Sequence, residues 1–183
     1  MGFAAWAELR TVYSQYPDFS RQKQTARRLR QPKSCIEVLA MLLGIDDLTD
    51  AEVLSILDDA KRFLETGIGH IKTKRFSLAL LFLAPSLRTR TGFATAAVRL
   101  GGTPIAVDAL RFGPTMTAFE SLDDTLRVLS GMVDIIVMRT PNRLDHERVR
   151  AAAACPIING GDGLGDHPVQ SLIDLFAITR HAI

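Results

Sequence analysis

The stretch SLALLFLA, residues 77–84, is the part of this sequence that decides its fold. Every residue after the first is apolar, and a short continuous apolar run is typical of a strand that is buried on both faces of a parallel sheet. Shorter apolar runs recur at residues 104–107 (PIAV), 134–138 (DIIVM) and 156–159 (PIIN). The sequence therefore predicts a parallel sheet of four strands or slightly more.

Segments with helical spacing of their apolar residues alternate with these strands. Thr49 and Glu52 form a capping box, which opens a helix that Gly67 ends. Further helices are predicted at residues 91–100, 121–130, 144–154 and 168–179. Because strands and helices alternate, we expect an α/β fold with three layers, α/β/α, around the parallel sheet.

Length and composition narrow the class of protein. The chain has 183 residues, a net charge of +2 and 47% hydrophobic residues, which suits one globular domain with a terminal extension. The near-neutral charge argues against nucleic acid as a partner. No apolar run reaches the ~20 residues of a membrane span, and residues 1–10 lack the pattern of a secretory signal, so we expect no membrane partner and a cytoplasmic location. Cys35 and Cys155 cannot form a disulfide framework, and no Cys/His cluster has the spacing of a metal site.

Residues 1–34 differ from the rest of the chain. A helical face is predicted from the spacing of Trp6, Leu9, Val12, Tyr13 and Tyr16. Basic residues then cluster between Arg21 and Lys33 without interleaved aromatic residues, which favours a solvated extension or a subunit contact over RNA or membrane binding. We therefore divide the chain into an N-terminal helical extension, residues 1–34, and one domain, residues 35–183.

The loop at residues 85–91 (PSLRTRT) carries the first candidate site. In parallel sheets ligands bind beyond the carboxyl ends of the strands, and this loop leads from a buried strand into a helix. The free N–H groups and the dipole of a helix start favour an anion. The hydroxyls of Ser86 and Thr89 and the guanidinium groups of Arg88 and Arg90 suit a phosphate. A helix cap with two surface arginines is the alternative interpretation.

Two further segments reach the same edge of the predicted sheet. Arg139 directly follows the strand DIIVM, and His167 and Gln170 stand at a helix start after the glycine-rich residues 160–166. A histidine in that position can donate a hydrogen bond to a developing oxyanion. Taken singly, Arg139 could be a surface arginine and His167 a helix cap. Together the three segments predict an anion site beside an oxyanion site.

These motifs, in this order, resemble those of the aspartate/ornithine carbamoyltransferase family. Residues 86–90 (SLRTR) resemble its phosphate loop S-T-R-T-R, and residues 120–139 (ESLDDTLRVLSGMVDIIVMR) resemble its next helix and strand, which end in a binding arginine. Residues 158–170 (INGGDGLGDHPVQ) resemble its H-P-x-Q segment. The resemblance runs from about residue 36 to the end of the chain, and it is closest to the aspartate branch.

The resemblance implies the amino-terminal, carbamoyl-phosphate-binding domain of that family, without a cofactor or a metal. The residues implied to bind carbamoyl phosphate are Ser86, Leu87, Arg88, Thr89, Arg139, His167 and Gln170. Arg88, Thr89, Arg139 and His167 are the implied catalytic residues. The implied mechanism is attack of an uncharged amine on the carbonyl carbon, with Arg139 and His167 stabilising the oxyanion and phosphate leaving.

For the complete protein, the resemblance implies a homotrimer that moves the carbamoyl group to an amino acid, aspartate, in pyrimidine biosynthesis. The family's second domain, which binds the amino acid, is absent from this chain, so the isolated chain is expected to be inactive. Two departures keep alternatives open. Leu87 stands where the family usually has Thr, and residues 109–119 lack the lysine that a neighbouring subunit lends in the aspartate branch. The alternatives are an ornithine or N-acylornithine carbamoyltransferase, and a non-catalytic scaffold or regulatory paralogue.

Overall fold

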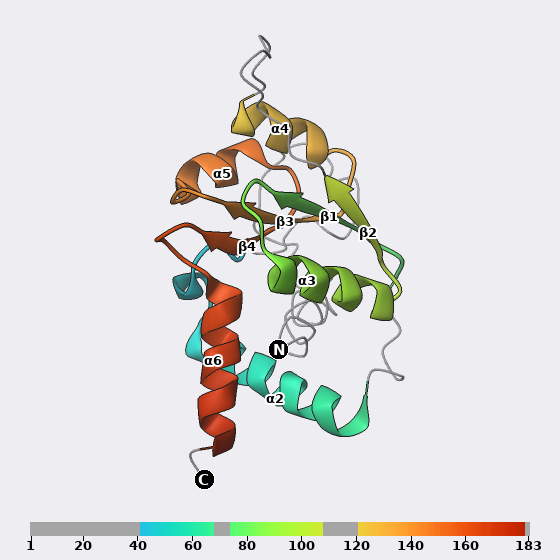
Figure 1. Ribbon diagram of the computed structural model, residues 1–183, viewed down its shortest axis with the longest axis vertical. Helices are drawn as coiled ribbons and strands as arrows, with labels where there is room; N and C mark the ends of the chain where they lie inside the picture. Colours follow the sequence, from blue (N-terminus) through green and yellow to red (C-terminus); the bar gives the residue numbers. More distant parts are fainter. Residues whose placement is uncertain (1–40, 68–73, 108–120, 182–183) are drawn as a thin grey trace, which may run out of the picture.

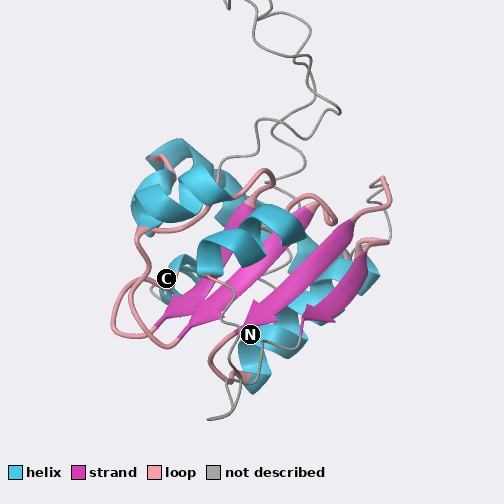
Figure 2. Cartoon of the chain, turned by 90° about the horizontal axis from the view of Figure 1, so that it is seen from above, coloured by secondary structure: helices cyan, strands magenta, loops and turns pink. Residues whose placement is uncertain are grey.

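A four-stranded parallel sheet forms the centre of the structure, a computed structural model that describes residues 41–67, 74–107 and 121–181. The strands are β1 (Ser77–Phe82), β2 (Thr103–Val107), β3 (Ile135–Thr140) and β4 (Ile157–Asp162), in the spatial order β2-β1-β3-β4. Figure 2 shows these strands running in the same direction between helices. The predicted extension at residues 1–34 and the loop at residues 109–119 lie outside the described residues.

Helices cover both faces of this sheet (Figure 1). One face carries α2 (Asp50–Thr66), α3 (Leu87–Arg99) and α6 (Pro168–His181), and the other carries α4 (Leu122–Leu129) and α5 (His146–Ala152). A short 3₁₀ helix, η1 (Ile45–Asp47), precedes α2. The predicted three-layer α/β/α fold with a parallel sheet is therefore confirmed. Within the described ranges, no helix is long and apolar enough to cross a membrane.

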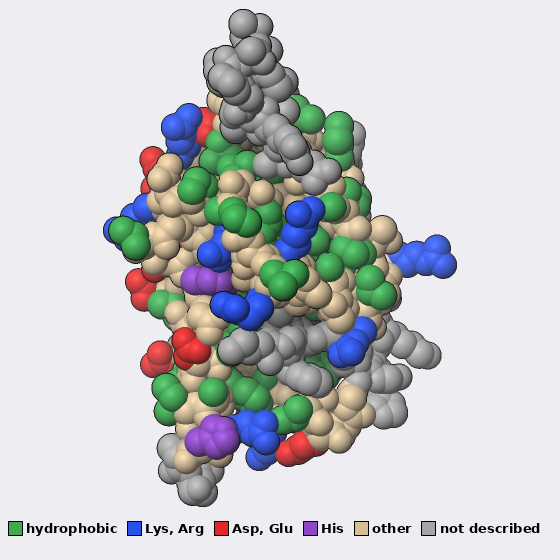
Figure 3. All heavy atoms as spheres, in the orientation of Figure 1, with side chains coloured by type: hydrophobic (Ala, Val, Ile, Leu, Met, Phe, Trp, Pro, Cys, Tyr) green, Lys and Arg blue, Asp and Glu red, His purple; other side chains and the backbone are tan. Residues whose placement is uncertain are grey.

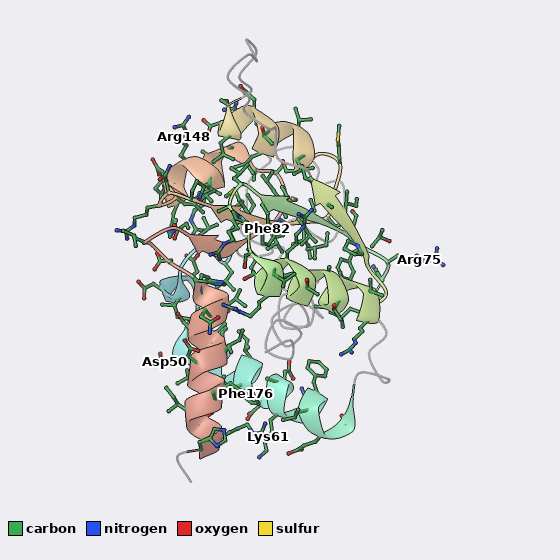
Figure 4. The ribbon with its side chains drawn as sticks, in the orientation of Figure 1. Asp50, Lys61, Arg75, Phe82, Arg148 and Phe176 are labelled. Atoms are coloured by element: carbon green, nitrogen blue, oxygen red, sulfur yellow. The ribbon has the colours of Figure 1, made fainter. Side chains whose placement is uncertain are left out.

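Alternating side chains of the strands fill two separate cores. In β1, Leu78 and Leu80 belong to the core beneath α2, α3 and α6, whereas Ala79 and Leu81 belong to the core beneath α4 and α5. This alternation is the period of two that a strand imposes. In Figure 4, Phe176 of α6 is labelled beside α2, on the first of these cores. Burial on both faces explains why the strand sequences are continuously apolar.

A short segment beyond β4 extends the sheet by one bridge. Leu42 pairs in parallel with Ile158, its N–H donates to the Ile157 carbonyl at 2.9 Å, and its own carbonyl accepts the Asn159 N–H at 2.8 Å. This bridge covers part of the outer edge of β4. A strand edge that is already paired is less available for pairing with other chains. The sheet is thus slightly larger than its four named strands.

Three element boundaries next to the candidate site differ from the predicted ones. The helix predicted to start at residue 91 begins at Leu87, the strand predicted at residues 134–138 runs to Thr140, and the strand predicted at residues 156–159 runs to Asp162. The last two extend because pairing between β3 and β4 continues to Thr140 and Asp162 across a register shift. Arg139 therefore lies within a strand, and Leu87 to Arg90 form the first helical turn.

Candidate anion-binding site

The candidate site lies at the carboxyl edge of the sheet, where β1, β3 and β4 lead into loops and helices. Phe82, labelled in Figure 4, is the last residue of β1, and α3 begins five residues later at Leu87. Figure 3 shows basic side chains gathered beside a histidine on the face where α3 and α6 begin. Positive charge is therefore concentrated at this edge.

The start of α3 supplies the first group of donors. Ser86 is its N-cap, and the first backbone hydrogen bond of the helix runs from the Arg90 N–H to the Ser86 carbonyl at 3.1 Å. The N–H groups before Arg90 have no partner within the helix and point out of its start, which is the positive end of its dipole. The Ser86 hydroxyl donates to Thr89 Oγ1 at 3.0 Å, so the two hydroxyls lie together there. This arrangement suits an anion.

Arg139 of β3 supplies the second group. Its Nη1 donates to the Gly160 carbonyl of β4 at 2.6 Å, which fixes the guanidinium across the strand ends. Its Nε is buried and has no hydrogen-bond partner among the described residues. A buried donor without a partner costs free energy, so this atom marks a place where a ligand oxygen would be stabilising.

His167 supplies a third donor between β4 and α6. Its Nδ1 accepts the Gln170 N–H at 3.3 Å. Burial, together with the positive charge of Arg139, lowers the pKa of His167 below its ordinary value. The imidazole is therefore neutral at neutral pH, and because Nδ1 is an acceptor the ring proton is on Nε2. His167 is thus a neutral hydrogen-bond donor.

Two glycines of β4 bring these groups together. A methyl group built on Gly160 would lie 3.3 Å from Thr89 Cγ2. A methyl group built on Gly161 would overlap Nη1 of Arg139 and lie 3.0 Å from Cδ2 of His167. The absence of side chains at these positions lets Thr89 of α3 approach Gly160, and lets Arg139 of β3 and His167 before α6 approach Gly161, the next residue of β4. Of the predicted site residues, the structure therefore joins Thr89, Arg139 and His167, with Ser86 beside Thr89.

The remaining predicted site residues, Gln170, Leu87 and Arg88, differ in which of their groups a ligand could contact. The Gln170 side chain donates from Nε2 to Asp174 Oδ1 at 2.7 Å, which leaves its Oε1 as the atom that can accept from a ligand. The Leu87 side chain is 84% exposed, and Arg88 is also exposed. Leu87 can therefore offer a ligand its backbone N–H, while its side chain contributes no polar contact.

Sequence reasoning missed two buried polar residues of β4. Asn159 is 0% exposed and Asp162 is 1% exposed. Asp162 Oδ2 accepts the Leu144 N–H at 2.8 Å, and the Asn159 amide bonds to several backbone groups nearby. The available signal was a polar residue at the end of an apolar strand, because buried polar side chains require specific partners.

Among the described residues, neither a metal site nor a cysteine nucleophile is indicated. No group of three or more His, Cys, Asp or Glu side chains that could hold a metal ion occurs among those residues. Burial, with a smaller contribution from Asp134, raises the pKa of Cys155 to about 12, so this buried thiol stays protonated at neutral pH. Cys155 is therefore unsuited to act as a nucleophile.

Comparison with known families gives one match over most of the chain. Residues 41–180 match the family model described as aspartate/ornithine carbamoyltransferase, carbamoyl-P binding domain. The aspartate carbamoyltransferase catalytic subunit of Methanocaldococcus jannaschii is 40% identical over 146 residues, which are 76% of this chain and 46% of that protein. The same subunit of Methanoculleus marisnigri is 41% identical over 142 residues, 76% of this chain and 46% of that protein.

Solved structures give the same result for the fold. The catalytic subunit of M. jannaschii aspartate transcarbamoylase matches with a TM-score of 0.68 and 38% identity, over 78% of this chain and 47% of that one. Aspartate transcarbamoylase from Trypanosoma cruzi in complex with carbamoyl phosphate and aspartate matches with a TM-score of 0.63 and 27% identity, over 76% of this chain and 47% of that one. The chain thus spans about half the length of the relatives it matches.

Proposed function

This chain belongs to the aspartate/ornithine carbamoyltransferase family and carries its carbamoyl-phosphate-binding domain, and we propose that it is half of an enzyme that transfers the carbamoyl group to aspartate. The predicted resemblance to the family and to its aspartate branch is confirmed by the family match and by the relatives. The observation that carries the proposal is the convergence of Thr89, Arg139 and His167 around Gly160 and Gly161, beside the start of α3.

In the proposed site, carbamoyl phosphate lies along the edge between α3 and α6. Its phosphate is bound by the first-turn N–H groups of α3 and by Ser86, Leu87, Arg88, Thr89 and Arg139, with Leu87 contributing only its N–H. Its carbonyl oxygen accepts hydrogen bonds from Thr89, Arg139 and Nε2 of His167. Its amino group donates to Oε1 of Gln170, whose orientation is supported by the hydrogen bond from Nε2 to Asp174.

The proposed reaction is an acyl transfer that uses positioning and electrostatics. The uncharged amine of the acceptor attacks the carbonyl carbon, a C–N bond forms, and negative charge develops on the carbonyl oxygen. Arg139 and His167 stabilise that charge, the C–O bond to phosphate breaks, and the phosphate accepts the amine proton. Removing one such donor typically slows a reaction by ~100–1,000-fold. Neutral His167 can take this role because Nδ1 accepts the Gln170 N–H, which leaves the proton on Nε2 for donation to the carbonyl oxygen.

The proposal extends to a whole protein of the relatives' length, because this chain spans about half of that length. We propose that residues 35–183 form the carbamoyl-phosphate domain, and that residues 1–34 are an extension. We propose that aspartate binds to a part of the whole protein corresponding to the half of the relatives that this chain does not match. The proposed assembly is a homotrimer, and the proposed setting is pyrimidine biosynthesis in the cytoplasm. The names of the relatives, which are aspartate carbamoyltransferase catalytic subunits, support aspartate over ornithine as acceptor.

Calorimetric titration of the 183-residue chain tests the binding site. We expect saturable binding of carbamoyl phosphate and of inorganic phosphate, and loss of both in Arg139→Gln, because Arg139 contacts both ligands. Arg127→Gln is the matched control, because Arg127 pairs with Asp124 on α4 and carries the same charge outside the cluster of candidate side chains. Normal binding in Arg139→Gln, or no binding by the folded wild-type chain, would contradict the proposal.

A second variant separates the carbamoyl group from the phosphate. Gln170→Ala removes the proposed acceptor for the carbamoyl amino group and leaves the start of α3 intact. We expect about tenfold weaker binding of carbamoyl phosphate, since one polar partner of its carbamoyl group is lost, and unchanged binding of inorganic phosphate. Equal weakening for both ligands would show that Gln170 acts on the phosphate instead.

A further inference from the structure

Asn159 is a fully buried polar side chain beneath the candidate site, and none of the roles assigned above uses it. A side-chain amide has two N–H donors and a carbonyl acceptor, and leaving any of them unpaired in the interior costs free energy. Here Nδ2 donates to the Leu43 carbonyl at 2.8 Å and to the Asp166 carbonyl at 3.1 Å, while Oδ1 accepts the Gly161 N–H at 2.8 Å. Every donor of this amide is thus bound to the backbone of a neighbouring segment.

The bond to Gly161 fixes the backbone on which two candidate site residues pack. Gly161 has φ +109°, a conformation that favours glycine, and its Cα faces Nη1 of Arg139 and Cδ2 of His167. A small shift of this peptide would open or close the space that both side chains share. The Oδ1 atom of Asn159 holds the peptide through the Gly161 N–H.

The bond to Asp166 fixes the peptide that enters His167. The Asp166 carbonyl accepts from Nδ2 of Asn159 and also from the Asp162 N–H, the latter at 3.2 Å. The peptide before His167 is therefore tied twice to β4. The third bond, to Leu43, anchors the same amide to the segment that extends the sheet. One side chain thus connects Leu43 at the sheet edge, Gly161 of β4 and the loop before α6.

We propose that Asn159 is a positioning residue, whose amide holds Gly161 and the peptide before His167 at the separation that lets Arg139 and His167 bind one ligand. This inference rests on the proposed function, because it assumes that the ligand is carbamoyl phosphate. Asparagine suits the place for a chemical reason. Aspartate would keep the acceptor for Gly161 but turn an oxygen toward the carbonyls of Leu43 and Asp166, and serine is too short to reach all three segments.

The test compares Asn159→Ser and Asn159→Asp with Ser130→Ala. Ser130 is a matched control, because its buried hydroxyl accepts the Ala154 N–H at 2.9 Å but connects α4 to the loop before β4, at the other end of the strand. We expect all three variants to unfold at lower urea concentration. Only the Asn159 variants should bind carbamoyl phosphate at least about tenfold more weakly, as loss of a buried hydrogen-bond network implies.

Inorganic phosphate provides the internal comparison for these variants. Its affinity should fall less than that of carbamoyl phosphate. The phosphate keeps its contacts with the start of α3, which does not depend on Asn159, even where Arg139 shifts, whereas the carbonyl oxygen needs Arg139 and His167 held together. Folded Asn159 variants that bind carbamoyl phosphate as tightly as Ser130→Ala does would overturn the proposal. Equal losses for both ligands would also overturn it, because the effect would then not concern the carbamoyl group.

A spectroscopic measurement keeps the inference separate from the proposed function. If the wild-type chain binds no carbamoyl phosphate, the proposed function fails, and the imidazole nitrogen shifts of His167 still test Asn159. Those shifts should differ between the wild type and Asn159→Ser, and identical shifts would overturn the positioning role. If the Asn159 variants do not fold, the inference is tested by amide signals of the wild-type chain. Its Gly161 and Asn159 amide signals should move on saturation with carbamoyl phosphate, and unmoved signals would overturn the inference.

Discussion

At the scale of single residues, Gly161 controls how closely Arg139 and His167 approach each other. A methyl group at this position would meet both side chains, and the Gly161 N–H is held by Asn159. Arg139 Nη1 is bonded to the carbonyl of the preceding Gly160, so the guanidinium cannot move away without breaking that bond. The geometry of the candidate site therefore depends on a position that has no side chain.

Gly161→Ala should abolish ligand binding in a chain that still folds. The added methyl group would overlap Nη1 of Arg139, so the guanidinium would have to leave the site. Gly67→Ala is the matched control, because Gly67 also has a positive φ, +69°, yet no atom of the described residues lies within 4 Å of the position of its methyl group. Both variants carry the cost of an unfavourable backbone conformation, roughly 1–3 kcal/mol, measurable by urea unfolding. Comparable carbamoyl phosphate affinity in the two variants would contradict this prediction.

His167 should make the stability of the chain depend on pH. Burial, and then Arg139, lower its pKa in the folded state, so the unfolded chain binds a proton more readily than the folded chain. The free energy of unfolding should therefore fall as the pH drops below 6.5, the ordinary pKa of histidine, until the folded-state pKa is passed. Above pH 6.5 both states are neutral at this residue, and it contributes no slope.

Urea unfolding at several pH values between 7.5 and 5, a range spanning roughly one unit either side of the histidine pKa, measures this slope. His167→Gln should lose less stability on acidification than the wild type. His181→Gln, at the exposed end of α6, should behave as the wild type does. Parallel curves for wild type and His167→Gln would show that His167 is not buried in its neutral form.

At the scale of elements, sequence patterns predicted those features that depend on residues close together in the chain. Thr49 accepts the Glu52 N–H and starts α2 as its capping box indicates, and the apolar run of β1 is buried as predicted. The start of α3 and the end of β4 could not be read in this way. β4 continues through Gly160 and Gly161 because β3 lies beside it, and glycine-rich residues alone indicate a loop.

The same limit applies to the candidate site. The order of the motifs indicated Thr89, Arg139 and His167, since each follows a predicted strand. The side chains of Leu87 and Arg88 are exposed, and the hydrogen bond from Gln170 to Asp174 gives the amide its orientation. These properties depend on neighbours that are distant in sequence or on side-chain rotamers, which sequence patterns do not encode.

The amino ends of β1 and β3 are joined by hydrogen bonds of their own. Asp134, before β3, accepts the Ser77 N–H at 2.7 Å and the Ser77 hydroxyl at 2.8 Å, while its N–H donates to Ser77 Oγ at 3.1 Å. This reciprocal pair joins the amino ends of β1 and β3. It lies at the other end of these strands from the candidate site, so it should affect stability without affecting binding.

Asp134→Ala should therefore destabilise the chain by roughly 1–3 kcal/mol, because it leaves the partly buried Ser77 donors without a partner. Carbamoyl phosphate affinity should remain that of the wild type. Asp123→Ala is the control, since it removes a carboxylate that pairs with Arg148 on the surface, and it should cost less. The free energy of unfolding from urea titration and the affinity from calorimetry check both statements. Weaker ligand binding in Asp134→Ala would show that the two edges are coupled.

At the scale of the whole molecule, the topology places all the candidate side chains at one edge. Because every strand is parallel, β1, β3 and β4 end on the same side, where α3 and α6 begin. The candidate site is therefore assembled from segments more than eighty residues apart, from Ser86 to Gln170, and exists only when the sheet is formed. A ligand of this site should stabilise the entire fold, since the unfolded chain cannot bind it.

We expect carbamoyl phosphate, at about 100 times its Kd, to raise the free energy of unfolding by about 2.7 kcal/mol. The reason is mass action, because the ligand binds the folded chain and not the unfolded one. Urea unfolding with and without ligand measures the increase, which should vanish in Arg139→Gln and persist in Arg127→Gln, where the lost charge lies on α4. An equal increase in Arg139→Gln would mean that the ligand binds elsewhere on the folded chain, and that the convergence around Gly160 and Gly161 is structural rather than functional.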